Sequence, residues 1–310
     1  MGMLNTLIDA VVSKKERAAF MRTWTSMNHL LPKGGPAVWG DAAADGSGGG
    51  GAPDDFLQVC PERNRTFGAM IYMDGVPLDQ DQVHALLLDV DPTGAWSRRA
   101  REEWSFGVLH AAHPLVVQGP HRLQVAELQR YWTNPLESRL PNAPNMTIHC
   151  MYGVGRPSER QYYYRDAENN MPAEGVPHTH DNNRVSRYSL DLDEDDADCL
   201  TKNGVQSGDG DGTIPLLSLS YLCMEGWNDP LFNPHGVKVV VNEYKDNALP
   251  FLMNPRGGDA AADHVDMLGN REFLEEVILL ATGHDELVHE HIHSEASRIC
   301  KNIHARVKAL

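Results

Sequence analysis

The sequence predicts an α/β fold, and three segments from residue 146 onward carry that prediction. Residues 146–154 (MTIHCMYGV) are a short apolar, β-branched and aromatic run followed by glycine and proline, which is typical of a buried strand. Residues 236–244 (GVKVVVNEY) form a second, valine-rich strand. A long loop follows, and residues 267–281 then place apolar side chains at helical spacing. Strand, loop and helix in this order make an α/β unit.

The C-terminal stretch carries a single apolar stripe. From Val288 to Leu310 the apolar positions are separated by four, four, three, four, four and three residues. This spacing predicts one long amphipathic helix packed on the sheet.

The first half predicts shorter elements. Residues 78–90 and 97–109 have short helical patterns with a turn at 91–94 between them, and they predict a peripheral helical region. Residues 41–55 (DAAADGSGGGGAPDD) contain almost nothing to bury, so we expect a flexible insertion there.

Composition and charge exclude some functions. The chain has 27 Lys and Arg against 43 Asp and Glu, a formal charge of −16, and no basic stripe of the kind that nucleic-acid binding requires. It contains no apolar run of the roughly 18 residues that a membrane helix needs, and its start lacks the order of a signal peptide. These residues therefore predict an acidic chain without a membrane segment of its own.

The most informative segment is residues 207–225 (SGDGDGTIPLLSLSYLCME). Glycines on both sides of Asp211 favour a tight turn that holds a carboxylate against backbone N–H groups, and Thr213 is a possible N-cap of the helix that follows. A carboxylate held in this way can orient a histidine, although an ordinary Gly/Asp turn is the simpler alternative. His264 follows the next strand, so Asp211 and His264 come in the acid-then-histidine order of α/β-hydrolase triads.

Several long motifs resemble one family. Residues 22–41, 131–146, 151–164, 199–227 and 264–270 closely resemble the phospholipid:diacylglycerol acyltransferases, which belong to the lecithin:cholesterol acyltransferase-like branch of the α/β-hydrolases. The resemblance implies the C-terminal part of an α/β-hydrolase fold with helical cap or lid segments. It implies a single partial domain over 1–310, with a cap region at 22–145 and a C-terminal core at 146–310.

The resemblance also implies a reaction. These enzymes move the sn-2 acyl group of a phospholipid to diacylglycerol through a Ser-Asp-His triad, giving triacylglycerol and a lysophospholipid, without acyl-CoA, cofactor or metal. The acid of the family's GDGT motif falls on Asp211 and the histidine of its HVD motif on His264. Asp209, in the repeated DGDG, is the competing acid.

Further features follow from the resemblance. Cys199 and Cys223 match cysteines that flank the acid in the family, so a disulfide between them in an oxidising lumen is expected. The lid-like segments of Trp24 and Trp39 are candidates for lining an acyl groove, as are Trp132 and Trp227. By resemblance the location is the lumenal side of the endoplasmic reticulum membrane, reached through an N-terminal part that is absent here.

The nucleophile is the departure from the family. No G-x-S-x-G occurs in the 310 residues, and neither Ser47 nor Ser207 has a glycine two positions before it. We therefore expect a fragment that is inactive alone. The alternative is a non-catalytic lipid-binding or regulatory paralogue.

A literal HExxH motif, His289-Glu290-His291-Ile292-His293, raises a remote alternative, a zinc hydrolase using His289, Glu290 and His293. The glycine and histidine positions of the longer metzincin motif hold Ala296 and Ile299, and the HExxH falls inside the predicted amphipathic helix. The expectation is therefore that no metal binds.

Overall fold

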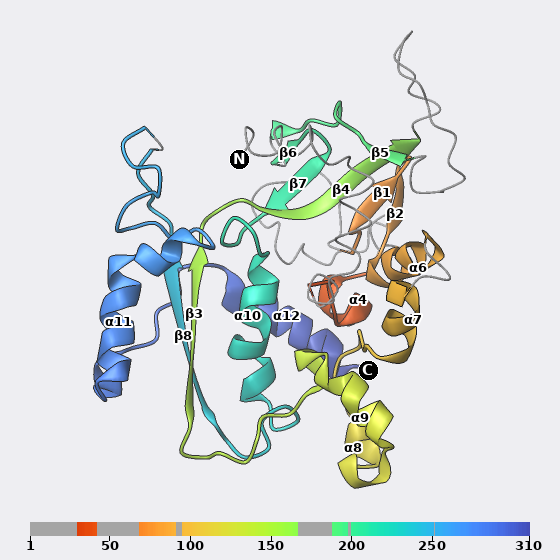
Figure 1. Ribbon diagram of the computed structural model, residues 1–310, viewed down its shortest axis with the longest axis horizontal. Helices are drawn as coiled ribbons and strands as arrows, with labels where there is room; N and C mark the ends of the chain where they lie inside the picture. The colour runs from red at the N-terminus through yellow and green to blue at the C-terminus, as the bar shows by residue number, and fades with distance from the viewer. Residues whose placement is uncertain (1–29, 42–67, 91–94, 167–187, 198–199, 251) are drawn as a thin grey trace.

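The computed structural model describes residues 30–41, 68–90, 95–166, 188–197, 200–250 and 252–310. Within these residues the strands form two sheets, and helices lie along and between them (Figure 1). The predicted insertion at 41–55 lies outside the described residues except for Asp41.

The first sheet consists of the two predicted strands. Strand β3 (Thr147–Val154) pairs in parallel with β8 (Lys238–Lys245) over eight residue pairs, from Thr147 opposite Lys238 to Val154 opposite Lys245. Both predictions are confirmed to within two residues. Because the strands are parallel and in register, their carboxyl ends meet at one edge, and loops leaving that edge can bring distant residues together.

The second sheet was not anticipated. Its strand order is β2 (Val76–Leu78), β1 (Ile71–Met73), β4 (Ser158–Asp166), β7 (Val205–Gly208) and β6 (Thr201–Lys202), with β5 (Tyr188–Leu190) beside β4. Strand β4 is parallel to β1 and antiparallel to β7. It begins just after β3 ends, so the chain passes from one sheet to the other, crosses the second sheet and returns along β7 to the acid-bearing turn (Figure 1).

Short helices make up much of the region before β3. They are α4 (Gly35–Trp39), α6 (Gln80–Val90), α7 (Ala95–Glu102), α8 (Pro114–Val117) and α9 (Val125–Trp132), with 3-10 turns at Pro120–Arg122 and Pro135–Glu137. Helix α6 confirms the first predicted pattern. The second prediction is too long, because the helix ends at Glu102 and the backbone of Ser105 and Leu109 pairs with Thr133 and Leu136 instead.

The C-terminal elements are a 3-10 turn (Asp266–Gly269), α11 (Arg271–Ala281), a second turn (Asp285–Leu287) and α12 (Ala296–Lys308). The helix predicted at 267–281 is confirmed from Arg271 onward, and the first residues of that range belong to the 3-10 turn instead. The single helix predicted from Val288 is wrong in its first part, because the chain runs beside β8 until Ser294. His291 exchanges backbone hydrogen bonds with Val241 and Glu243, and this pairing competes with helix formation.

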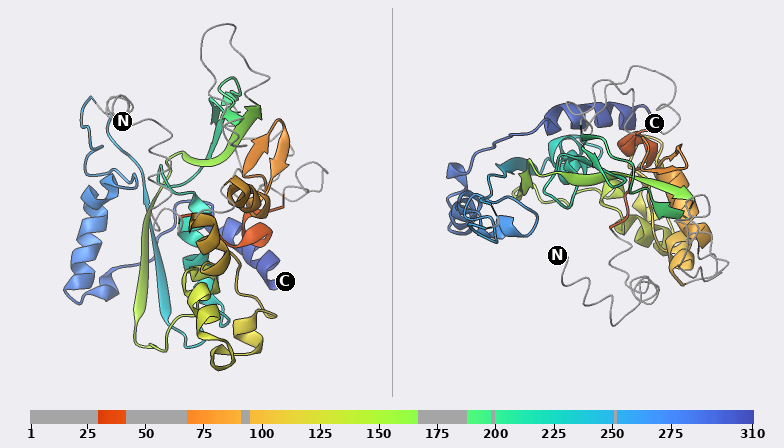
Figure 2. Two further views of the ribbon diagram at one scale, coloured as in Figure 1. Left: turned by 45° about the vertical axis from the view of Figure 1, so that its right-hand side comes forward. Right: turned by 90° about the horizontal axis from the view of Figure 1, so that it is seen from above.

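The core lies around α10 (Leu216–Met224), which a 3-10 turn at Gly226–Asn228 follows. One side of α10 contacts β3 and β8, and the other contacts α12 (Figure 2). Helix α12 therefore packs on α10 and α4 rather than directly on the sheet, and buries Ile299, Ile303 and Val307 completely. Burying each such side chain contributes about 1.5–3 kcal/mol.

Candidate active site

Asp211 lies in a tight turn just before α10. Its carboxylate Oδ1 accepts the backbone N–H groups of Thr213 at 2.9 Å and Ile214 at 2.7 Å, and the residue is only 4% exposed. Gly212 turns the chain at φ 87°, which a side chain rarely allows. The predicted turn is therefore present. The N-cap position of α10 is Pro215 rather than Thr213.

His264 lies on the loop that leaves β8, and it makes two hydrogen bonds with Asp211. Its backbone N–H donates to the Asp211 carbonyl at 2.8 Å, and its side-chain Nδ1 is 2.7 Å from Asp211 Oδ2. Hydrogen bonding to the carboxylate assigns the proton of the neutral ring to Nδ1, so Nε2 carries the lone pair. The side chain of His264 is 43% exposed, whereas that of Asp211 is 5% exposed.

Gly153, near the end of β3, permits this approach. A Cβ atom at Gly153 would lie 1.8 Å from the carbonyl oxygen of Ala262, two residues before His264. Only a glycine allows the histidine loop to pack so close to the strand, and hence close to the acid turn.

Asp209, the competing acid, has different partners. Its Oδ1 accepts the backbone N–H groups of Gly155 at 2.8 Å and Gly210 at 2.7 Å. Burial raises the pKa of its carboxyl, while these two N–H groups act in the opposite direction. Within the described residues no hydrogen bond joins Asp209 to His264, so its contacts fix the acid turn to the end of β3.

Arg156 and Asp246 also belong to this cluster and were missed by sequence reasoning. Arg156 follows β3, Asp246 follows β8, and their side chains form an ion pair with Nη1 3.4 Å from Oδ2. The available signal was their position, because charged residues directly after two parallel strands converge at one sheet edge.

A cavity of about 870 Å³ adjoins the acid turn. Its lining includes Thr213, Ile214 and Pro215, which directly follow the Asp211–Gly212 turn, although neither Asp211 nor His264 lines it. The remaining lining is largely apolar and includes Trp39, Trp132, Val38, Leu136, Leu217 and Tyr221. Trp39 and Trp132 line this cavity, Trp227 packs against the main core, and Trp24 lies outside the described residues.

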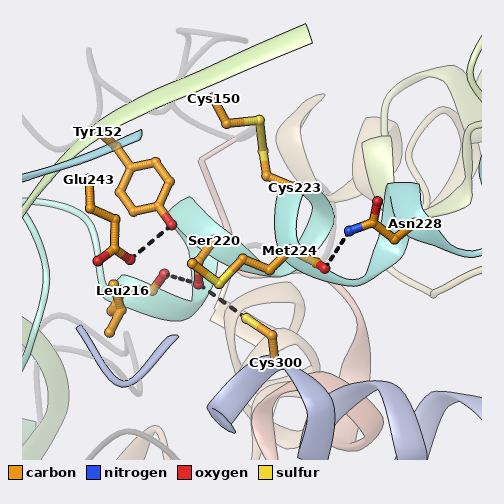
Figure 3. The surroundings of a disulfide bond; sticks show 9 residues. All are labelled: Cys150, Tyr152, Leu216, Ser220, Cys223, Met224, Asn228, Glu243 and Cys300. Carbon is orange, nitrogen blue, oxygen red and sulfur yellow. Dashed lines mark hydrogen bonds between the residues drawn. A yellow bond between two sulfur atoms is a disulfide. The ribbon is translucent and has the colours of Figure 1, made fainter. Parts of the chain in front are cut away.

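The disulfide differs from the expected one. Cys223 of α10 bonds to Cys150 of β3, with Cα atoms 6.3 Å apart (Figure 3). The predicted Cys199–Cys223 pair is therefore wrong, because α10 packs on β3 and directs Cys223 toward that strand. Cys199 lies outside the described residues. The buried Cys300 of α12 lies near α10 as well, with Sγ 3.3 Å from Ser220 Oγ.

The HExxH residues do not share a helix face. They precede α12, and His291 bonds through its ring to the Glu243 carbonyl and to Glu276. Among the residues that the structure describes, no group of three His, Cys, Asp or Glu side chains could hold a metal ion. The helical geometry that a zinc-binding HExxH requires is absent at this motif.

Comparison with known proteins identifies the family. A family model described as lecithin:cholesterol acyltransferase matches residues 5–271. The chain belongs to this family. A "phospholipid:diacylglycerol acyltransferase" of Schizosaccharomyces pombe is 32% identical over 300 residues, which is 96% of this chain and 42% of that protein.

Two further relatives of this chain have similar names. A "phospholipid:diacylglycerol acyltransferase" of Saccharomyces cerevisiae is 29% identical over 92% of this chain and 39% of its own length. "Phospholipid:diacylglycerol acyltransferase 1" of Arabidopsis thaliana is 38% identical over 53% of the chain and 23% of its own length. The chain thus spans about two fifths of the length of the two yeast relatives. Over the described residues, no helix has the length and apolar character to cross a membrane.

Proposed function

We propose that Asp211 and His264 are the acid and the base of an acyl transfer from phospholipid to diacylglycerol. The observation that carries the proposal is the 2.7 Å contact between His264 Nδ1 and a nearly buried Asp211 carboxylate. This arrangement orients the ring with Nε2 free to accept a proton, and the carboxylate stabilises the imidazolium that forms. The names of the relatives and the apolar cavity beside the acid turn support the substrate class.

The reaction needs a serine that these 310 residues do not supply in a G-x-S-x-G elbow. His264 Nε2 takes the serine proton as the serine oxygen attacks the sn-2 ester carbonyl of the phospholipid. The same proton then passes to the departing lysophospholipid oxygen, leaving an acyl-serine. In the second half, His264 takes the proton of the diacylglycerol hydroxyl, which attacks the acyl-serine, and returns it to the serine.

The disulfide supports a compartment. Disulfides persist in oxidising environments such as the lumen of the endoplasmic reticulum, and Cys150–Cys223 joins two elements of the core. We propose that the chain works on the lumenal side of the endoplasmic reticulum membrane, as part of a larger acyltransferase that includes the serine.

A second function has one observation in its favour. The apolar cavity is formed although no elbow serine is present, so a non-catalytic chain could bind lipid there. Under this alternative the isolated chain binds phospholipid, but no addition of a serine-containing half confers transfer.

The test uses a chimera in which this chain replaces the aligned 300 residues of the S. pombe relative. Transfer of labelled acyl groups from phosphatidylcholine to diacylglycerol is measured. Asp211→Asn turns an NH₂ group toward His264 Nδ1 and favours the wrong ring tautomer, so we expect a rate loss of about 10⁴-fold. His264→Ala removes the base and should lower the rate at least as much.

Asp209→Asn is the matched control. The amide oxygen of Asn can still accept the N–H groups of Gly155 and Gly210, so transfer should stay within about tenfold of the unsubstituted chimera. Near-normal transfer by His264→Ala, or a greater loss from Asp209→Asn than from Asp211→Asn, would contradict the assignment.

A further inference from the structure

The guanidinium of Arg156 lies between the acid turn and the histidine loop. Its Nη1 is 3.4 Å from Asp246 Oδ2, and its Nη2 is 3.6 Å from Asp263 Oδ2. Asp246 directly follows β8, and Asp263 directly precedes His264. The Arg156 side chain therefore contacts both the residue that follows β8 and the residue that precedes His264.

Backbone contacts tie the same residue to the acid. The Arg156 N–H donates to the Gly210 carbonyl at 3.0 Å, and Arg156 forms a β-bridge with Asp211. Asp246 Oδ1 in turn accepts the N–H of Ala262 at 2.7 Å. The two strand ends, the acid turn and the histidine loop are thus joined around Arg156 and Asp246.

Charge and space explain why an arginine is suited to this place. The Asp246 side chain is only 8% exposed, and a carboxylate so buried needs a partner. Asp263 is a second carboxylate of the same cluster. The two terminal nitrogens of the planar guanidinium can contact both carboxylates at once, whereas lysine offers a single charged nitrogen. Gly212 leaves the necessary room, because a Cβ there would lie 2.9 Å from Asp263 Oδ2 and 3.5 Å from Arg156 Cβ.

We propose that Arg156 is a positioning residue for the proposed acyl transfer, holding Asp263 so that the neighbouring His264 stays aligned on Asp211. This inference rests on the proposed function for its role in catalysis. The inference claims that Arg156 fixes the orientation of the His264 ring, and this orientation can be measured without an activity assay.

The measurement is the tautomer of His264 in the full 310-residue chain, read from ¹⁵N chemical shifts of labelled histidines above pH 8, where neutral rings prevail. The His264 signal is identified by its loss in His264→Gln. In the unsubstituted chain the ring should be in the Nδ1–H form. Arg156→Gln should produce a mixture of Nδ1–H and Nε2–H forms, and Arg156→Lys should give a smaller change.

His304 is the internal reference, because Tyr221 and Asp229 contact its two ring nitrogens on α12. Its signals should be the same in every variant. If the His304 signals change in Arg156→Gln, that variant has changed the structure generally, and the test then relies on Asp263→Asn. Asp263 is partly exposed, so its replacement by asparagine should leave the fold intact.

Asp263→Asn should shift the His264 tautomers in the same direction as Arg156→Gln, but less. A folded Arg156→Gln chain, or a folded Asp263→Asn chain, whose His264 remains wholly in the Nδ1–H form would overturn the proposal. Because the readout involves no substrate, absence of acyl transfer in the chimera would refute the proposed function and leave this result standing.

Discussion

At the scale of single residues, His84 of α6 is a histidine that the fold holds neutral. Its ring packs against Phe106 with centroids 4.2 Å apart, and within the described residues its Nε2 has no hydrogen-bond partner. Burial, together with the nearby positive charge of Lys33, lowers the pKa of His84 to about 4. The folded state therefore resists protonation of this ring.

This pKa predicts an acid-sensitive stability. Between pH 6.5 and about 4 the unfolded chain protonates His84 and the folded chain does not, so its contribution to stability is present above pH 6.5 and is lost as the pH falls through that range. Between pH 7 and pH 5 the difference in unfolding free energy between the unsubstituted chain and His84→Gln should change by about 2 kcal/mol. Denaturant unfolding at both pH values measures this difference, with His84→Phe as a second variant. If the unfolding free energies of the three chains change equally with pH, the interpretation is refuted.

The residues of the site differ in how far sequence could reveal them. The contact between Asp211 and His264 was predictable because each residue stands in a distinctive motif with glycine or a strand beside it. Arg156, Asp246 and Asp263 carry no such motif, since their roles depend on where two parallel strands end in space. The Cys150–Cys223 bond was missed because its partners are 73 residues apart and become neighbours only when α10 packs on β3.

At the scale of elements, the approach of β3 to the histidine loop is the tightest constraint near the site. Gly153→Ala would push the carbonyl of Ala262 away from the strand and displace His264 from Asp211. We expect a stability loss of about 1–3 kcal/mol, together with a much larger loss of transfer in the chimera. Thermal unfolding and the acyl-transfer assay measure the two effects.

Gly269→Ala is the control for Gly153→Ala, because a Cβ at Gly269 meets nothing within 4 Å. Its transfer activity should stay close to that of the unsubstituted chimera. Equal losses in the two variants would show that the close approach at Gly153 has no special importance.

The disulfide joins the middle of β3 to the last turn of α10, the helix that follows the acid turn. Its removal by the double change Cys150→Ala and Cys223→Ala should cost about 4 kcal/mol, because the bond closes a loop of 73 residues in the unfolded chain. A reducing agent should lower the melting temperature of the unsubstituted chain and of Cys300→Ala, but not that of the double variant. Insensitivity of the unsubstituted chain to reduction would contradict the bond.

The C-terminal segment shows why element boundaries were harder to predict than element types. The apolar stripe correctly indicated a helix, but its first third runs along β8 instead. The buried carboxylate of Glu243 accepts the N–H groups of His293 at 2.6 Å and Ser294 at 2.7 Å, and the hydroxyl of Ser294 at 2.7 Å. These hydrogen bonds come from a residue 50 positions earlier, so no local pattern could reveal them.

At the scale of the whole molecule, sequence predicted two strands and an α/β unit, but neither the parallel pairing of the two strands nor the second sheet. The apolar pattern fails in β4 because Ser158, Arg160, Gln161 and Asp166 are among its buried residues and its register shifts between Glu159 and Gln161. The other strands of that sheet have only two to four residues. This sheet nevertheless matters for the site, since β4 and β7 link the end of β3 to Asp211.

The central claim is that this chain contributes the acid and the base of a phospholipid-dependent acyl transfer. The most direct measurement supplies the chimera with diacylglycerol and phosphatidylcholine labelled in its sn-2 acyl chain, and follows every labelled and lysophospholipid product. The account predicts that labelled triacylglycerol and unlabelled lysophospholipid form in equal amounts, and that His264→Ala abolishes the formation of both. Labelled triacylglycerol that persists in His264→Ala, or a well-folded unsubstituted chimera that forms none, would contradict it.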